Sequence, residues 1–195
     1  MKRRRLLCWT PLALLALVAP GCSHSPPPPS LTRNLTLSEL EQAVRFKNPS
    51  TVTIVALANQ YLASGRDADG HAYFCERSAQ APDRAAFRAF CGVFQVRMSS
   101  TVPLLKRSDW VKDGMAKLDQ AAGTDGLSRY LRGVVAAELP EGFGRAQQAT
   151  EDLKWVLAQQ NAFPPGIRRA AWVGLSHAYR SLGKTEESKQ ALAQA

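Results

Sequence analysis

Apolar residues recur three and four positions apart along most of residues 36–195, the spacing of helices that bury one face. The pattern predicts helices over about 36–45, 49–64, 67–81, 84–99, 108–122, 125–138, 144–161, 166–182 and 184–194. Thr36 and Glu39 have the spacing of a capping box, which favours a helix start there. TVTIV, from Thr51, is the one β-branched run, and it continues into ALANQYL with helical spacing. The fold class expected is therefore all-α.

Glycines and prolines separate these segments, at Gly65, Pro82, Gly123, Pro140 and Gly183. Helices of 12–18 residues joined by short breaks favour antiparallel hairpins. We therefore expect about eight to nine helices, stacked hairpin against hairpin.

Two segments share the pattern Leu-small-x-x-aromatic-x-x-x-Gly: LANQYLASG from Leu57 and LSHAYRSLG from Leu175. Phe74 and Pro82 follow the first copy at the spacing of the repeat family that the pattern resembles. The chain thus resembles the tetratricopeptide repeat (TPR) family, whose repeat is a 34-residue helix-turn-helix unit. The resemblance implies a short TPR-like α-solenoid, with insertions at Ser100–Ser108 and Glu138–Gly144 because the middle copies are degenerate. Arg77 departs from the family, which has a small residue there. A non-repeat helical bundle is the alternative.

The N-terminal residues have the form of an export signal. Lys2 to Arg5 precede an apolar run, Leu6 to Ala19, which is short for a membrane span and typical of a signal peptide. The segment closes on Gly21-Cys22-Ser23 and resembles a bacterial lipoprotein signal, although Ala19 and Pro20 are atypical. The resemblance implies that 1–21 are removed and that Cys22 carries the lipid. Ordinary cleavage near Ala19 is the alternative.

The resemblance also implies a place for the chain in the cell envelope. Ser23 implies sorting to the periplasmic face of the outer membrane. Residues 22–35 include SPPPPS, a stiff extended spacer, and 36–195 form the folded domain.

The formal charge is +9, from 25 Lys and Arg against 16 Asp and Glu. Without the four signal cations the balance is 21 to 16, which favours mild attraction to an acidic partner or lipid over nucleic-acid binding. An exported protein also has little access to nucleic acid.

Cys75 and Cys91 lie at equal distances on either side of Asp83, which follows Pro82. On adjacent antiparallel helices both would lie about 12 Å from the turn, so a disulfide between them is expected. Two free thiols are one alternative. A metal site with His71, four residues before Cys75, is another, but no fourth ligand is spaced to follow, so no metal is expected. A redox-active pair is a third, although such cysteines usually form Cys-x-x-Cys.

Catalytic signatures are missing from the sequence: it has no phosphate-binding glycine loop, nucleophile elbow, His-Glu-x-x-His or Cys-x-x-Cys. The acidic pairs Glu138/Glu141, Glu151-Asp152 and Glu186-Glu187 are placed like solvated helix faces. We therefore expect a non-enzyme without cofactors.

The TPR resemblance implies a groove lined by the first helix of each hairpin. It places Asn59 and Leu62 in the groove of the first copy, and His177 and Arg180 in that of the last. Val55 replaces a cation of the family's carboxylate clamp, so binding of a free C-terminus by that device is not expected.

The two insertions add candidate contact residues: Leu104, Leu105, Lys106, Arg107 and Phe143. Each candidate has a plain alternative, a solvated side chain or a loop packed on the body. Trp155 and Trp172 are expected in the core.

These observations favour a non-catalytic envelope lipoprotein that acts as a protein–protein interaction scaffold or adaptor, anchored to the membrane only by its lipid. The alternative is an oligomeric small-molecule-binding accessory, resembling the T-component of tripartite periplasmic transporters. A cell-wall hydrolase is a third class.

Overall fold

A computed structural model describes residues 35–45, 49–159 and 162–195. These residues form nine α-helices and three short 3-10 helices, with no strand among them. The helices are α1 (Leu37–Arg45), α2 (Thr51–Ala63), α3 (Asp67–Gln80), α4 (Ala85–Arg97), α5 (Arg107–Ala122), α6 (Gly126–Glu138), α7 (Ala146–Ala158), α8 (Pro165–Ser181) and α9 (Thr185–Ala193). The predicted all-α class is confirmed, and the predicted boundaries agree to within about three residues. Cys22 and the predicted signal peptide lie outside the described residues.

Local side-chain chemistry starts several of these helices. The capping box of α1 is formed: the Thr36 amide donates to Glu39 Oε2 at 2.8 Å, and the Glu39 amide donates to Thr36 Oγ1 at 3.3 Å. Asp125 caps α6 by accepting the Ser128 amide at 2.7 Å. Gly65 and Gly183, which end α2 and α8, have φ values of 67° and 71°, which glycine adopts readily.

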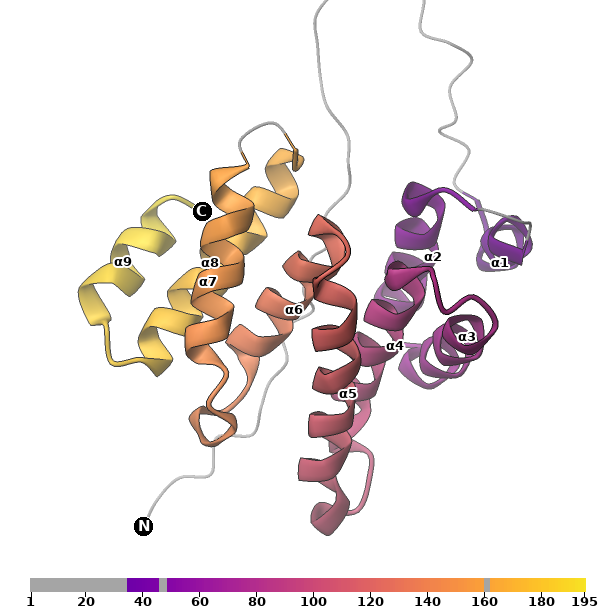
Figure 1. Cartoon of the computed structure of the whole chain (residues 1–195), viewed down its shortest axis with the longest axis horizontal. Coiled ribbons are helices and arrows are strands. Elements are labelled where there is room, and N and C mark those ends of the chain that lie inside the picture. The colour runs from indigo at the N-terminus through magenta and orange to yellow at the C-terminus, as the bar shows by residue number, and fades with distance from the viewer. Residues whose placement is uncertain (1–34, 46–48, 160–161) are drawn as a thin grey trace, which may run out of the picture.

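The helices stack as antiparallel hairpins, α2/α3, α4/α5, α6/α7 and α8/α9, in a short TPR-like α-solenoid (Figure 1). The first helices of successive hairpins pack on one another, since α6 contacts both α4 and α8. Each second helix also contacts the first helix of the next hairpin, as α3 contacts α4 and α7 contacts α8. In a solenoid of this kind each hairpin is stabilised mainly by its neighbours.

Helix α1 precedes the first hairpin and packs against α2. The Tyr61 hydroxyl donates to the Glu41 carboxylate, and the Tyr73 hydroxyl donates to the Glu41 carbonyl at 3.2 Å. Burial, assisted by the bond to Glu41, raises the pKa of Tyr61 well above its usual value. Tyr61 therefore stays a neutral donor that holds α1 in place.

Small residues allow the two helices of a hairpin to approach closely. A Cβ added at Gly92 on α4 would lie 2.6 Å from the Gly114 carbonyl oxygen on α5. In the last hairpin Ser176 and Ser188 have this role: their hydroxyls are 3.0 Å apart, and Ser188 also donates to the Ser176 carbonyl at 2.9 Å. The repeat character thus persists at Gly92 and Gly114, in a copy whose sequence had looked degenerate.

The two predicted insertions lie between helices. Residues Met98–Ser100 and Leu104–Lys106 form the 3-10 helices η1 and η2 between α4 and α5, and Glu141–Phe143 forms η3 between α6 and α7. Gly144 ends η3 with a φ of 65°.

A disulfide joins Cys75 on α3 to Cys91 on α4, with the two Cα atoms 4.7 Å apart. The bond therefore links the second helix of one hairpin to the first helix of the next, as the symmetric spacing around Asp83 predicted. It closes a loop across 16 positions of the chain.

Removing this bond is expected to lower the free energy of unfolding by about 3 kcal/mol, because the cross-link restricts the unfolded chain. Urea denaturation of the oxidised protein, with and without a phosphine reductant, measures the difference. The double variant Cys75→Ala/Cys91→Ala is the matched control, because the reductant should not shift its midpoint. Equal midpoints for oxidised and reduced wild type would contradict the expectation.

Candidate functional site

The predicted groove residues of the first hairpin lie on α2 and are both half-buried. Leu62 packs against the hydrophobic core. The Asn59 Oδ1 atom is buried and has no hydrogen-bond partner in the structure. An unpaired buried acceptor is costly, so Asn59 is a position where a water or a ligand donor would be stabilising.

The predicted residues of the last hairpin differ in their surroundings. His177 on α8 bonds through Nδ1 to the Glu138 carboxylate at the end of α6, and both side chains are half-buried. Arg180 is exposed. The His177–Glu138 contact ties α8 to α6, so His177 contributes to packing between hairpins.

Helix α4 leaves little open surface in the middle of the solenoid. Of its 13 residues, 11 are buried, and the other two are Arg88 and Arg97. A helix that lines an open groove has an exposed stripe, and α4 has none. Helix α4 itself therefore offers a partner little surface.

The loop before α5 exposes the strongest apolar pair of the described chain. Leu104 and Leu105 are 76% and 93% exposed. Arg107 holds the backbone beneath them: its Nε donates to the Val102 carbonyl at 3.1 Å and its Nη2 to the Ser100 carbonyl at 2.9 Å. Lys106 is exposed beside the leucines. The loop thus presents two leucines and a cation on a fixed turn.

Phe143 in the second insertion is only half-exposed, and it packs against the core. Trp155 on α7 is likewise half-buried against the core, and the Arg129 guanidinium lies 4.7 Å from its ring centroid. Neither aromatic side chain is displayed as an open contact surface.

A cleft of about 600 Å³ lies among α7, α8 and α9 at the C-terminal end of the stack. Its floor is apolar and its rim carries both charges. The floor is formed by Leu157, Trp172, Leu175, Tyr179 and Ala191, and the rim by Lys154, Glu187, Gln190 and Gln194.

A cation–π contact lies within this cleft. The Lys154 ammonium lies 5.5 Å from the Tyr179 ring centroid, so a cation covers part of the aromatic floor. The sequence did not predict the cleft, because Trp172 has the pattern of a core residue. The one available signal was the aromatic pair Trp172 and Tyr179, seven residues apart on one helix face.

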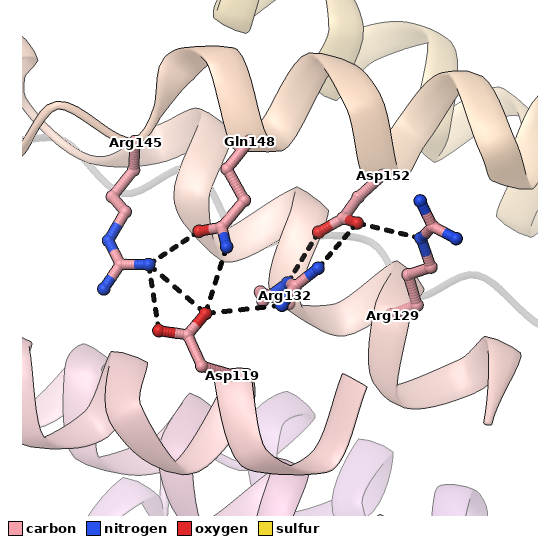
Figure 2. A network of polar contacts seen from close by, with 6 residues as sticks. All are labelled: Asp119, Arg129, Arg132, Arg145, Gln148 and Asp152. Carbon is pink, nitrogen blue, oxygen red and sulfur yellow. Dashed lines mark hydrogen bonds and ion pairs between the residues drawn. The ribbon is translucent and has the colours of Figure 1, made fainter. Parts of the chain in front are cut away.

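A polar cluster lies between α5, α6 and α7, and in it Asp152 is buried while the other five residues are half-buried (Figure 2). Arg132 donates to both oxygens of Asp152, at 2.7 and 2.8 Å, and Arg129 donates to Asp152 Oδ1 at 2.9 Å. Arg145 and Gln148 meet at Asp119, where Arg145 Nη1 donates to Oδ2 at 2.9 Å. Arg132 also reaches Asp119 Oδ1 at 3.4 Å. The cluster therefore joins the second hairpin to the third.

The interpretation of Asp152 as a solvated residue was wrong: its side chain is 1% exposed. The carboxylate lies between two arginines that are spaced three apart on α6, so its charge is balanced within the protein. The hydrogen bond to Asp152 raises the pKa of Arg132 above its usual value despite partial burial. The cluster therefore has a structural role: its ion pairs hold the helices together.

Another cluster contains the disulfide. His71 and Cys75 on α3 and Cys91 on α4 place one nitrogen and two sulfur atoms within 4.8 Å of one another. Burial lowers the pKa of His71, and the positive charge of Lys117 lowers it further. The spacing of these three residues had been considered as a metal site, which was not expected because no fourth ligand is spaced to follow.

No helix of the described residues is long and apolar enough to cross a membrane.

Comparisons with known proteins find only distant structural similarity. No protein-family model matches the chain, and no curated protein matches it significantly. A solved structure of MamA (MamA MSR-1 C2) is 19% identical, covers 81% of this chain and 82% of its own, and has a TM-score of 0.45. A structure of a MamA mutant is also 19% identical, covers 81% and 83%, and has a TM-score of 0.44. Because both scores are this low, the fold assignment rests on the helix packing described above.

Proposed function

We propose that this protein is a non-catalytic interaction scaffold of the cell envelope, which holds a segment of a partner protein in the C-terminal cleft of its TPR-like stack. The observation that carries the proposal is the cleft itself, with an apolar, aromatic floor and a rim of both charges. Aromatic anchors surrounded by polar groups are typical of protein-binding sites.

The cleft specifies the chemistry of the segment. Trp172 and Tyr179 provide a floor for one or two apolar side chains. Lys154 and Glu187 on the rim favour an acidic and a basic group flanking them.

The charged clusters support a role without catalysis. Asp152 and Asp119 are each bonded to two arginines. The oxygens of these carboxylates are thus committed to contacts within the protein. Asp152 is the one buried acidic residue among the described residues, and its contacts are structural.

A photo-crosslinking residue at Gln194, on the rim, tests the proposal in cells. We expect an adduct with one other envelope protein, lost in Trp172→Ala. The same residue at Asp109, exposed on α5 and far from the cleft in sequence, is the matched control. Adducts only with further copies of the chain, or the same adducts from both positions, would overturn the scaffold role.

The membrane anchor is a separate part of the proposal, supported by the sequence around Cys22. Replacing Cys22 with serine removes the thiol that would receive the lipid, so the protein should move from the membrane fraction to the soluble periplasmic fraction. Incorporation of a radiolabelled fatty acid should be lost at the same time. Cys8→Ser is the control, since Cys8 lies in the segment expected to be removed. Unchanged labelling of Cys22→Ser would exclude the lipoprotein assignment.

A second function, binding of a small molecule by an oligomeric accessory protein, is favoured by the size of the cleft. Small-molecule sites commonly enclose about 300–1,000 Å³, and this cleft is about 600 Å³. This alternative predicts self-association, which light scattering of the purified protein measures. A monomer that forms the foreign adduct from Gln194 would favour the scaffold.

A further inference from the structure

The disulfide and the imidazole beside it have the composition of a metal site. His71 and Cys75 lie four residues apart on one face of α3, and Cys91 faces them from α4. Their ligand atoms all lie within 4.8 Å of one another. No fourth His, Cys, Asp or Glu joins this group within the described ranges.

Neighbouring side chains hold the trio in place. Cys91 is buried beside the aromatic core, whereas His71 and Cys75 are half-buried. Gln95, itself buried, interacts with the His71 side chain and donates to the Trp110 carbonyl at 3.2 Å. The rings of His71 and Trp110 lie 5.6 Å apart. Partners that orient a ligating imidazole in this way strengthen metal sites.

We propose that the reduced protein binds one thiophilic closed-shell cation, Zn²⁺ or Cu⁺, through His71, Cys75 and Cys91. The oxidised protein cannot, because both sulfur atoms are committed to the S–S bond. The site is therefore open only after reduction, and the disulfide and the metal are alternative links between α3 and α4.

The chemistry balances in two steps. A dithiol reductant supplies two electrons and two protons: the S–S bond breaks, two thiols form, and the dithiol becomes a cyclic disulfide. The cation then displaces the two thiol protons, and two metal–sulfur bonds and one metal–nitrogen bond form.

The two cations use this ligand set differently. Zn²⁺ with two thiolates is neutral, and a water molecule would complete its tetrahedral coordination on the half-exposed side. Cu⁺ is a soft cation that thiolates select, and the trio alone would leave it three-coordinate with one negative charge. The surroundings exclude neither, so both are tested.

The experiment is a metal titration of the full-length protein with Cys8→Ser and Cys22→Ser, which leaves Cys75 and Cys91 as its only cysteines. The protein is kept reduced by a phosphine under anaerobic conditions. Zn²⁺ is competed against a chelating dye, and Cu⁺ against a cuprous chelator. We expect one equivalent of at least one cation to bind the reduced protein and none to bind the oxidised protein. His71→Ala should weaken binding by more than about tenfold. His177→Ala, which removes a histidine far from the trio in sequence, should bind like wild type.

A thermal melt distinguishes a folded site from two loose thiols. A cation that binds only the folded protein raises the melting temperature of the reduced form. Binding to thiols of an unfolded chain would lower the melting temperature and would be the same in His71→Ala. That result, or no binding of either cation by the reduced protein, would overturn the proposal.

Discussion

Replacing Asp152 with alanine is expected to lower the free energy of unfolding by about 3–5 kcal/mol, because it leaves charges in the protein without their partner. Arg132 loses both of its short hydrogen bonds to Asp152, and Arg129 loses one. The Arg132 side chain is only 18% exposed, so water replaces the lost carboxylate poorly. Urea denaturation followed by circular dichroism measures the change.

Two controls separate this effect from the loss of any surface charge. Asp109 pairs with Lys112 at 3.8 Å on an exposed face, so Asp109→Ala should cost less than about 1 kcal/mol. In an Arg132→Ala background, Asp152→Ala should cost less than it does alone, because the two residues are coupled. Additive effects of the two substitutions would show that the buried ion pair does not act as a unit.

Local patterns in the sequence predicted the helices well. The Thr36–Glu39 box, the glycines that end α2 and α8, and the three-and-four spacing of apolar residues act within one or two turns of the chain. The disulfide was predictable for a related reason: Cys75 and Cys91 are equally far from a single turn, so the geometry of one hairpin junction decides whether they meet.

The Asp152 cluster could not be predicted in the same way. Arg132 and Asp152 are 20 residues apart with an insertion between them, and in sequence Asp152 stands beside Glu151, which is exposed. Only the packing of α6 against α7 brings the carboxylate to the two arginines. Two adjacent acidic residues favour a prediction of solvent exposure, and the sequence alone does not show which of them faces a neighbouring helix.

The cleft was hidden by a similar ambiguity. Trp172 and Tyr179 have the spacing of a buried stripe, and aromatic residues on such a stripe are usually core. Here α9 covers α8 incompletely, which leaves both rings half-exposed. Whether a stripe is buried depends on the neighbouring helix, and no local pattern on α8 contains that information.

Replacing Phe94 with alanine should have an effect as large as the Asp152 substitution, about 3–5 kcal/mol of unfolding free energy. Phe94 on α4 is fully buried. Its ring stacks on Phe74 of α3 at 5.6 Å and meets Tyr61 of α2 edge-on at 6.2 Å. The substitution therefore opens a cavity where the first two hairpins join, while exposed Leu105→Ala, the control, should change stability by less than about 0.5 kcal/mol.

A substitution at Gly70 gives a second test of the Phe94 packing, because Gly70 lies against the Phe94 ring. A Cβ at Gly70 would lie 2.6 Å from Phe94 Cε1, so Gly70→Ala should destabilise the wild-type protein by about 1–3 kcal/mol through overpacking. In the Phe94→Ala background the ring is gone. There the same substitution should stabilise by about 0.5–1 kcal/mol, because alanine favours a helix more than glycine does and fills part of the cavity. The sign of the Gly70→Ala effect thus depends on Phe94. A destabilisation of equal size in both backgrounds would mean that the glycine is required by the α3 backbone and not by the aromatic junction between the hairpins.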